Sequence, residues 1–107
     1  MYAGPAVRVH GDLHPANLIV RDGALAAVVD FGDTTTGDPA TDVAVAWLAF
    51  GLTGRDALLA DLGPDPGAMR RARGWALVIA AALVTVSEPD SPMVSLGERA
   101  LTELIAR

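Results

Sequence analysis

The chain has 107 residues and a formal net charge of −5 at pH 7. This length suits one domain, and an acidic chain lacks the basic face that binds nucleic-acid phosphates, so we expect no nucleic-acid partner. The absence of cysteine excludes disulfides and thiolate metal sites and fits a reducing, cytoplasmic compartment. The longest apolar run, residues 75–86, is too short to span a bilayer, so we expect no membrane segment.

The first third of the chain predicts a short strand, a loop and a hairpin. Residues 6–9 alternate weakly and indicate a strand entering the polar loop at 10–17. Two apolar runs, 18–20 and 25–29, are short enough to be strands, and Arg-Asp-Gly at 21–23 is a turn signal between them. Residues 30–37 are rich in Thr, Gly and Asp, and we expect them to form a loop.

The rest of the chain predicts helices. Three starts share one pattern, a capping side chain followed by proline: Asp38-Pro39, Asp65-Pro66 and Ser91-Pro92. We expect these helices to reach about residues 52, 86 and 106, with a short helix over 56–62 before Gly63-Pro64. The back half of the helix over 66–86 is apolar all round, which predicts burial on several sides, and Trp47 and Trp75 are expected in the core.

Three polar residues lie at the two ends of the predicted hairpin. Asp12 and Asn17 precede its first strand, and Asp30 follows its second. Because antiparallel strands place these ends side by side, we expect the three side chains to converge. Phosphoryl transfer needs such a set, because Asp12 can deprotonate an attacking hydroxyl while Asn17 and Asp30 hold Mg²⁺ on the nucleotide phosphates.

The spacing of these residues matches a known pattern: His-Gly-Asp at 10–12, four residues, Asn17, then Asp-Phe-Gly at 30–32. With Gly-Asp-Pro-Ala-Thr-Asp at 37–42, it resembles the aminoglycoside phosphotransferases and their choline-kinase-like relatives, over about residues 7–50.

The resemblance implies an ATP- or GTP-dependent kinase with Asp12 as catalytic base and with Asn17 and Asp30 as ligands of Mg²⁺ and hence of the nucleotide. It implies that Asp42 braces the catalytic loop through backbone N–H groups and that His10 packs beneath that loop. The fold expected is α+β: the mostly helical C-terminal lobe of a protein-kinase-like fold, with a small antiparallel hairpin carrying the loop.

Lysine is absent, and all eight basic residues are arginine. Kinases of this type hold the α and β phosphates with a strand lysine that precedes the catalytic loop, beneath a Gly-rich loop. Neither feature occurs in this sequence. We therefore expect residues 1–107 to form one domain, the catalytic lobe without an N-terminal nucleotide-binding lobe. By itself this chain should be inactive, and it should depend on a missing lobe or a dimer partner.

The sequence favours the catalytic lobe of a phosphotransferase that acts on a small hydroxyl- or amine-bearing substrate. An acidic lobe suits a cationic substrate such as an aminoglycoside. A truncated, non-catalytic remnant, or half of a split kinase that binds a partner lobe, is the main alternative. A metal-dependent hydrolase is a further one, because His10 and His14 flank Asp12.

Overall fold

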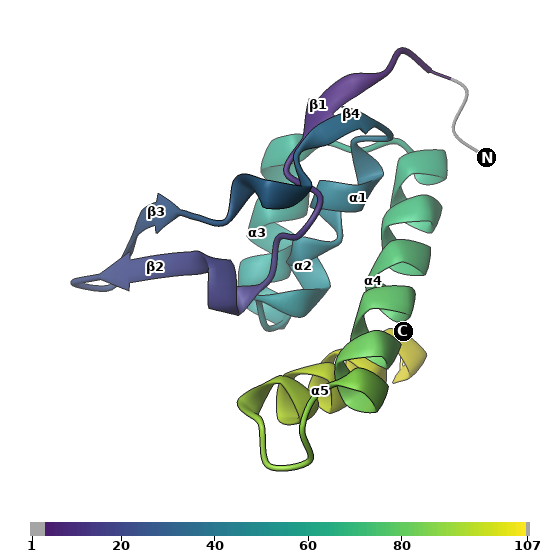
Figure 1. Cartoon of the computed structure of the whole chain (residues 1–107). Coiled ribbons are helices and arrows are strands. Elements are labelled where there is room, and N and C mark those ends of the chain that lie inside the picture. Colours follow the sequence, from purple (N-terminus) through teal and green to yellow (C-terminus); the bar gives the residue numbers. More distant parts are fainter. Residues whose placement is uncertain (1–3, 107) are drawn as a thin grey trace.

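The computed structural model describes residues 4–106, apart from the side chains of residues 16 and 33. Two small antiparallel sheets lie beside a helical body, as the α+β prediction requires (Figure 1). The β2–β3 hairpin projects away from the helices, while α4 and α5 form the opposite side of the molecule. Within the described part of the chain, no helix has the length and apolar character needed to cross a membrane.

The predicted hairpin is present. Strand β2 covers Leu18–Arg21 and β3 covers Ala24–Val28, so the turn is Asp22-Gly23. Both turn residues have positive φ, 53° for Asp22 and 78° for Gly23. A two-residue turn of this kind matches the right-handed twist of its strands, and Asp-Gly is one of the pairs that form it at low cost. The turn therefore fixes the register of the two strands, which places the start of β2 beside the end of β3.

A second strand pair joins the segment before the polar loop to the segment after Asp30. Strand β1, Val7–Val9, pairs with β4, Thr35–Gly37, in antiparallel register. The prediction of a loop over residues 30–37 was therefore wrong for residues 35–37, which form β4. Threonine is β-branched and favours extended backbone when a partner strand is present. That partner lies far back in the sequence, so local composition did not reveal it.

Five helices follow, and the bounds predicted for the last two, α4 and α5, are confirmed. They are α1 Ala40–Val43, α2 Val45–Leu48, α3 Leu52–Leu62, α4 Pro66–Val86 and α5 Pro92–Ala106. The single helix expected up to residue 52 is instead two short ones that meet at Ala44, whose backbone stays helical. Helix α3 begins four residues earlier than predicted, after the extended Gly51. The Asp65 cap holds α4 as expected, because its Oδ1 accepts from the Ala68 N–H at 2.8 Å.

The main core lies where α1 and α2 pack on α4, with part of α5. Trp47 is 2% exposed, which confirms its predicted place in the core. Its ring lies against two cations, the guanidinium groups of Arg55 at 5.9 Å and Arg73 at 5.7 Å. Each arginine is also tied to α5, Arg55 to the Glu103 carboxylate and Arg73 to the Leu104 carbonyl. These contacts stabilise the tryptophan and join four helices, α2, α3, α4 and α5.

Helix α4 is not buried on several sides, contrary to the prediction. Trp75 is 43% exposed and Val78 is 61% exposed. The buried side of α4 is a narrow row of alanines, Ala72, Ala76 and Ala80, each with no exposed surface. Hydropathy alone could not distinguish these two sides, because both are apolar. The open side of α4 therefore needs an explanation other than core packing.

We predict that Gly97→Ala destabilises the fold and that Gly74→Ala does not. A Cβ on Gly97 would lie 2.7 Å from the Ala80 carbonyl oxygen, where α5 meets α4. Backbone cannot yield easily, so we expect a loss of about 1–3 kcal/mol. No heavy atom lies within 4 Å of a Cβ on Gly74, so the same change there should gain roughly 0.5–1 kcal/mol through helix propensity. Urea unfolding of both variants checks this, and equal effects would contradict the packing argument.

Candidate active site around the Asp12 loop

Asp42 in α1 binds the backbone at the start of the loop over residues 10–17. The two Asp42 carboxylate oxygens accept separate backbone hydrogen bonds, from the His10 N–H at 2.7 Å and the Gly11 N–H at 3.0 Å. This is the contact that the resemblance implied for Asp42. Gly11 has φ 90°, a conformation that suits glycine, and this turns both N–H groups toward one carboxylate. A charged acceptor makes these bonds stronger than bonds to a neutral acceptor.

His10 is 7% exposed and connects the loop to the hairpin. Its Nδ1 accepts the Asp12 N–H at 3.1 Å, and its Nε2 lies 2.8 Å from the Val29 carbonyl oxygen. These partners require the neutral tautomer with the proton on Nε2, because Nδ1 faces a donor and Nε2 faces an acceptor. The ring also contacts Phe31, with centroids 4.6 Å apart. His10 therefore orients Asp12 through the backbone and packs below the loop.

The Asp12 carboxylate is held between two side chains of its own loop. Its Oδ2 accepts from Asn17 Nδ2 at 3.2 Å, and its Oδ1 lies 3.4 Å from His14 Nε2. The same Asn17 nitrogen donates to the Asp12 carbonyl oxygen at 2.9 Å. The Asp12 side chain remains 37% exposed, so its oxygens can meet a substrate. The structure thus brings Asp12 and Asn17 together as predicted.

Asp30 joins this group through the backbone. The Val29 N–H donates to the Asn17 carbonyl oxygen at 2.9 Å, so Asp30 is the next residue after the one paired with Asn17. Asp30 has φ 62° and ψ 65°, and its side chain is exposed. A left-handed backbone is uncommon in residues other than glycine and occurs often at functional sites. It also sits directly before the short 3-10 turn at Phe31–Asp33.

The sequence of this chain was also compared with known protein families. A model of the phosphotransferase enzyme family matches residues 2–76. The chain belongs to this family. No curated protein and no solved structure matches the chain. Membership in the phosphotransferase family supports phosphoryl-group transfer as the reaction class.

The phosphotransferase family match stops at residue 76, whereas the surface beside Asp12 continues along α4. A cavity of about 340 Å³ lies between Asp12 and His14 on one side and the second half of α4 on the other. Sequence analysis missed this wall, because a run of Val, Ile, Leu and Ala carries no functional motif. The exposure of the aromatic and aliphatic side chains of α4 became visible only in the structure.

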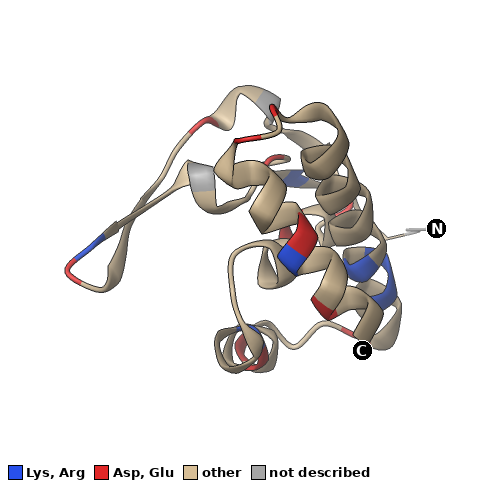
Figure 2. Cartoon of the chain, turned by 90° about the horizontal axis from the view of Figure 1, so that it is seen from below, with Lys and Arg blue, Asp and Glu red and all other residues tan. Residues whose placement is uncertain are grey.

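In the part of the chain that the structure describes, basic side chains do not gather around the site (Figure 2). Arg71 donates from Nε to Asp38 Oδ2 at 2.9 Å, which ties α4 to the start of α1. Arg73 is engaged in the core, as described above. Figure 2 shows the basic positions spread over the hairpin tip and the helices. Among the described residues, these two arginines therefore serve the fold.

We predict that Asp42→Asn destabilises the chain by about 2 kcal/mol or more. The amide can still accept one N–H, but its NH₂ group then faces the second donor without an acceptor, and the charge assistance is lost. Asp56→Asn is the matched control, since it removes the same charge at an exposed position of α3 and should change stability by less than about 0.5 kcal/mol. Thermal unfolding of both variants measures the difference, and similar values would argue against the brace.

Proposed function

We propose that this chain carries the catalytic loop of a phosphotransferase that moves the γ-phosphoryl group of ATP or GTP to a small hydroxyl-bearing substrate. The observation that carries the proposal is the Asp12–Asn17 pair, hydrogen-bonded at 3.2 Å, together with the backbone bond from the Val29 N–H, the residue before Asp30, to the Asn17 carbonyl. Family membership supports the reaction class. The roles of the individual residues are part of the proposal.

Asp12 is proposed to orient the substrate hydroxyl and take its proton. The attacking oxygen then bonds to the γ-phosphorus as the bond to the β–γ bridging oxygen breaks, and the nucleoside diphosphate leaves. Asn17 Nδ2 fixes one carboxylate oxygen of Asp12, and the other lies 3.4 Å from His14 Nε2, beside the cavity that Asp12 and His14 both line. Asp42 and His10 are positioning residues, because they act on the loop backbone rather than on the reacting atoms.

The donor set fits Mg²⁺ bound together with nucleotide. The two side-chain hydrogen bonds from Asn17 to Asp12 both use Nδ2, so Oδ1, the metal-binding atom, lies outside them, and Asp30 adds one exposed carboxylate. Mg²⁺ binds to one or two carboxylates plus phosphates and water, so it needs no larger cluster. Within the described part of the chain, no three His, Cys, Asp or Glu side chains form a metal site of their own. The metal would supply charge neutralisation on the phosphates.

We propose that the phosphate-holding lysine comes from outside these 107 residues, because the sequence contains no lysine. A nucleotide-binding lobe would contribute it, as the sequence analysis expects. The hairpin offers apolar surface for such a lobe, since Ile19 is 43%, Val20 66% and Leu25 61% exposed. A remnant that binds a partner lobe without catalysis uses the same surface, and activity measurements separate the two. The cytoplasmic location expected from the sequence stays a prediction.

The hydrolase alternative fits the geometry less well. A metal-binding imidazole must offer a nitrogen lone pair, and in His10 the Nδ1 lone pair accepts the Asp12 N–H while Nε2 carries the proton. His14 and Asp12 alone would leave a metal with too few protein ligands for a hydrolytic centre.

We predict that Mn²⁺, used as a paramagnetic substitute for Mg²⁺ in the presence of ATP, broadens amide signals of residues 10–17 and 28–32. Asp30→Asn should weaken this effect at least tenfold, because the only carboxylate proposed as a ligand is lost. Asp22→Asn is the matched control, since Asp22 is also exposed and also has positive φ, but lies at the hairpin turn. NMR titration measures both. Broadening that persists in Asp30→Asn would remove Asp30 from the metal site.

We also predict that turnover separates base from ligand in the enzyme purified from its native host. Asp12→Ala and Asp30→Ala should each nearly abolish phosphoryl transfer. Raising Mg²⁺ should restore part of the activity of Asn17→Ala, which loses one ligand atom and the tether on Asp12, and none of the activity of Asp12→Ala. Steady-state rates over a range of Mg²⁺ concentrations test this, and equal rescue of the two variants would refute the role assignment.

A further inference from the structure

The cavity beside Asp12 has one polar end and one long apolar wall. Its volume is about 340 Å³, within the range of small-molecule sites. Asp12 and His14 form the polar end, and Ser87 adds a hydroxyl where α4 stops. The wall consists of aliphatic side chains from α4: Val78, Ile79, Ala82, Leu83 and Val86. A molecule that fills this cavity therefore meets a carboxylate at one end and hydrocarbon along its length.

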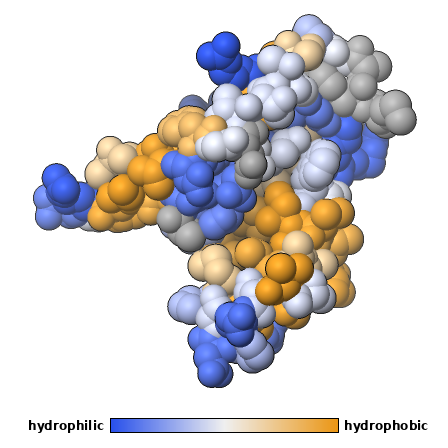
Figure 3. All heavy atoms as spheres, viewed as in Figure 1, coloured by the Kyte–Doolittle hydropathy of each residue, from blue (hydrophilic) through white to orange (hydrophobic). Residues whose placement is uncertain are grey.

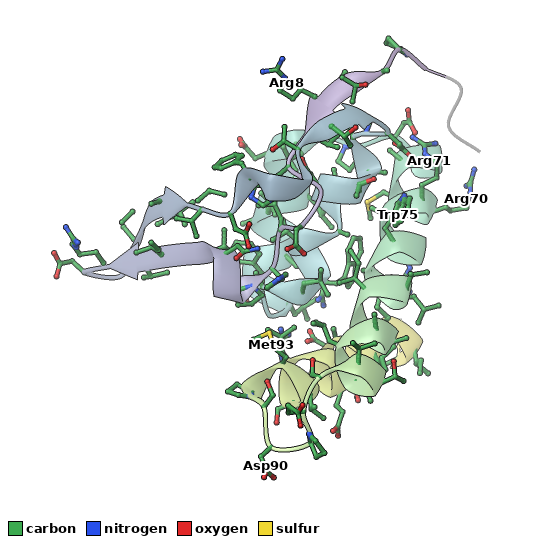
Figure 4. All side chains as sticks on the ribbon, in the orientation of Figure 1. Arg8, Arg70, Arg71, Trp75, Asp90 and Met93 are labelled. Atoms are coloured by element: carbon green, nitrogen blue, oxygen red, sulfur yellow. The ribbon has the colours of Figure 1, made fainter. Side chains whose placement is uncertain are left out.

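The apolar wall extends past the cavity along one side of α4. Positions 75, 78, 79, 82 and 86 recur at helical spacing and form one stripe. Val78 lines both this cavity and a neighbouring hollow that contains Trp75. Figure 3 shows hydrophobic surface over α4 next to the hydrophilic surface of the loop region, and Figure 4 shows Trp75 on the same helix. Substrate longer than the cavity would therefore continue over apolar surface.

The cavity holds few groups that could bind a polycationic substrate. Asp12 is the only acidic residue that lines it among the described residues. A molecule with several ammonium groups needs several carboxylates, and placing an ammonium group against hydrocarbon without a partner is costly. The net charge of −5, which favoured a cationic substrate at the level of the sequence, is thus not concentrated in this cavity.

We propose that the phosphoryl acceptor is an amphipathic alcohol, whose hydroxyl lies at Asp12 and whose apolar body lies along α4. This inference rests on the proposed function, because it assigns the substrate class of the same site. It replaces the aminoglycoside that the acidic composition suggested. The Asp12 carboxylate orients the molecule, and burial of its hydrocarbon on Val78 and Val86 supplies the affinity.

A larger cavity elsewhere in the molecule does not compete for this role. It measures about 440 Å³ and lies between the hairpin and helices α2 and α3. All of its lining residues are apolar, with no titratable group among them. A molecule in that cavity would have no base near its hydroxyl, so the cavity cannot place an acceptor for phosphoryl transfer.

Binding can be tested without turnover by NMR titration of the ¹⁵N-labelled chain with 1-butanol, 1-pentanol and 1-hexanol. We expect shifts confined to the amides of residues 12–14 and 75–87. Affinity should rise about threefold to fourfold for each added methylene that is buried. The methyl ether of 1-hexanol cannot donate to Asp12, so it should bind at least threefold more weakly. Kanamycin, a polycationic polyol, should cause no shifts there.

Three substitutions test whether binding occurs in this cavity or on apolar surface in general. Val78→Asp places a charge on the wall at a position that is 61% exposed, so the fold should tolerate it. We expect 1-hexanol to bind at least tenfold more weakly to this variant. Leu77→Asp is the control, because Leu77 is on the same helix and 46% exposed but does not line the cavity, and binding should stay within twofold. Val86→Asp, at an 82% exposed position, should repeat the Val78 result.

Several outcomes would overturn the proposal: no alcohol-induced shifts, equal effects of Val78→Asp and Leu77→Asp, equal binding of the methyl ether, or kanamycin shifting the same amides at lower concentration. The Mn²⁺ titration keeps this result distinct from the proposed function. Metal binding at Asp30 without alcohol binding would reject the amphipathic acceptor alone, and alcohol binding without metal binding at Asp30 would reject the phosphotransferase mechanism.

Discussion

The two hydrogen bonds from the loop backbone to Asp42 connect the core of this molecule to its chemistry. Asp42 lies in α1 between Ala40 and Ala44, which are 1% and 0% exposed and pack in the main core. The carboxylate therefore has the rigidity of the packed helix, and it fixes the N–H groups of His10 and Gly11 directly before Asp12. The start of this loop thus obtains a defined shape from a helix more than thirty residues later in the chain.

The second constraint is a chain of hydrogen bonds that returns from the loop to the hairpin. His10 contacts the Val29 carbonyl, the Val29 N–H contacts the Asn17 carbonyl, and Asn17 Nδ2 holds Asp12. Most of these bonds involve the backbone, so strand pairing rather than side-chain packing sets the distances between the loop and the end of the hairpin. The turn at Asp22-Gly23 fixes that pairing, although it lies at the far end of the hairpin.

Local signals in the sequence were enough to predict the hairpin and the capped start of α4, because turn and capping preferences act over a few residues. His10 and Asp42 came only from the family resemblance, since nothing local indicates that a helical aspartate accepts bonds from a distant loop. Strand β4 was missed because its partner β1 is remote in sequence. Trp75 was placed in the core wrongly, because hydropathy records how apolar a side chain is and not whether another element covers it.

Helix α4 combines two functions on adjacent sides, and its residue sizes separate them. Its buried row consists of alanines at 72, 76 and 80, and these small side chains let α4 pack closely against its neighbours. The larger residues Trp75, Val78 and Val86 point away from this packing and remain open. Substitutions at these three positions remove no contact of the two core clusters, so this part of the surface beside Asp12 can change in shape and polarity while the Asp42 brace, which depends on the buried side, stays in place. In this molecule the specificity of the site can therefore vary independently of the geometry that positions its base.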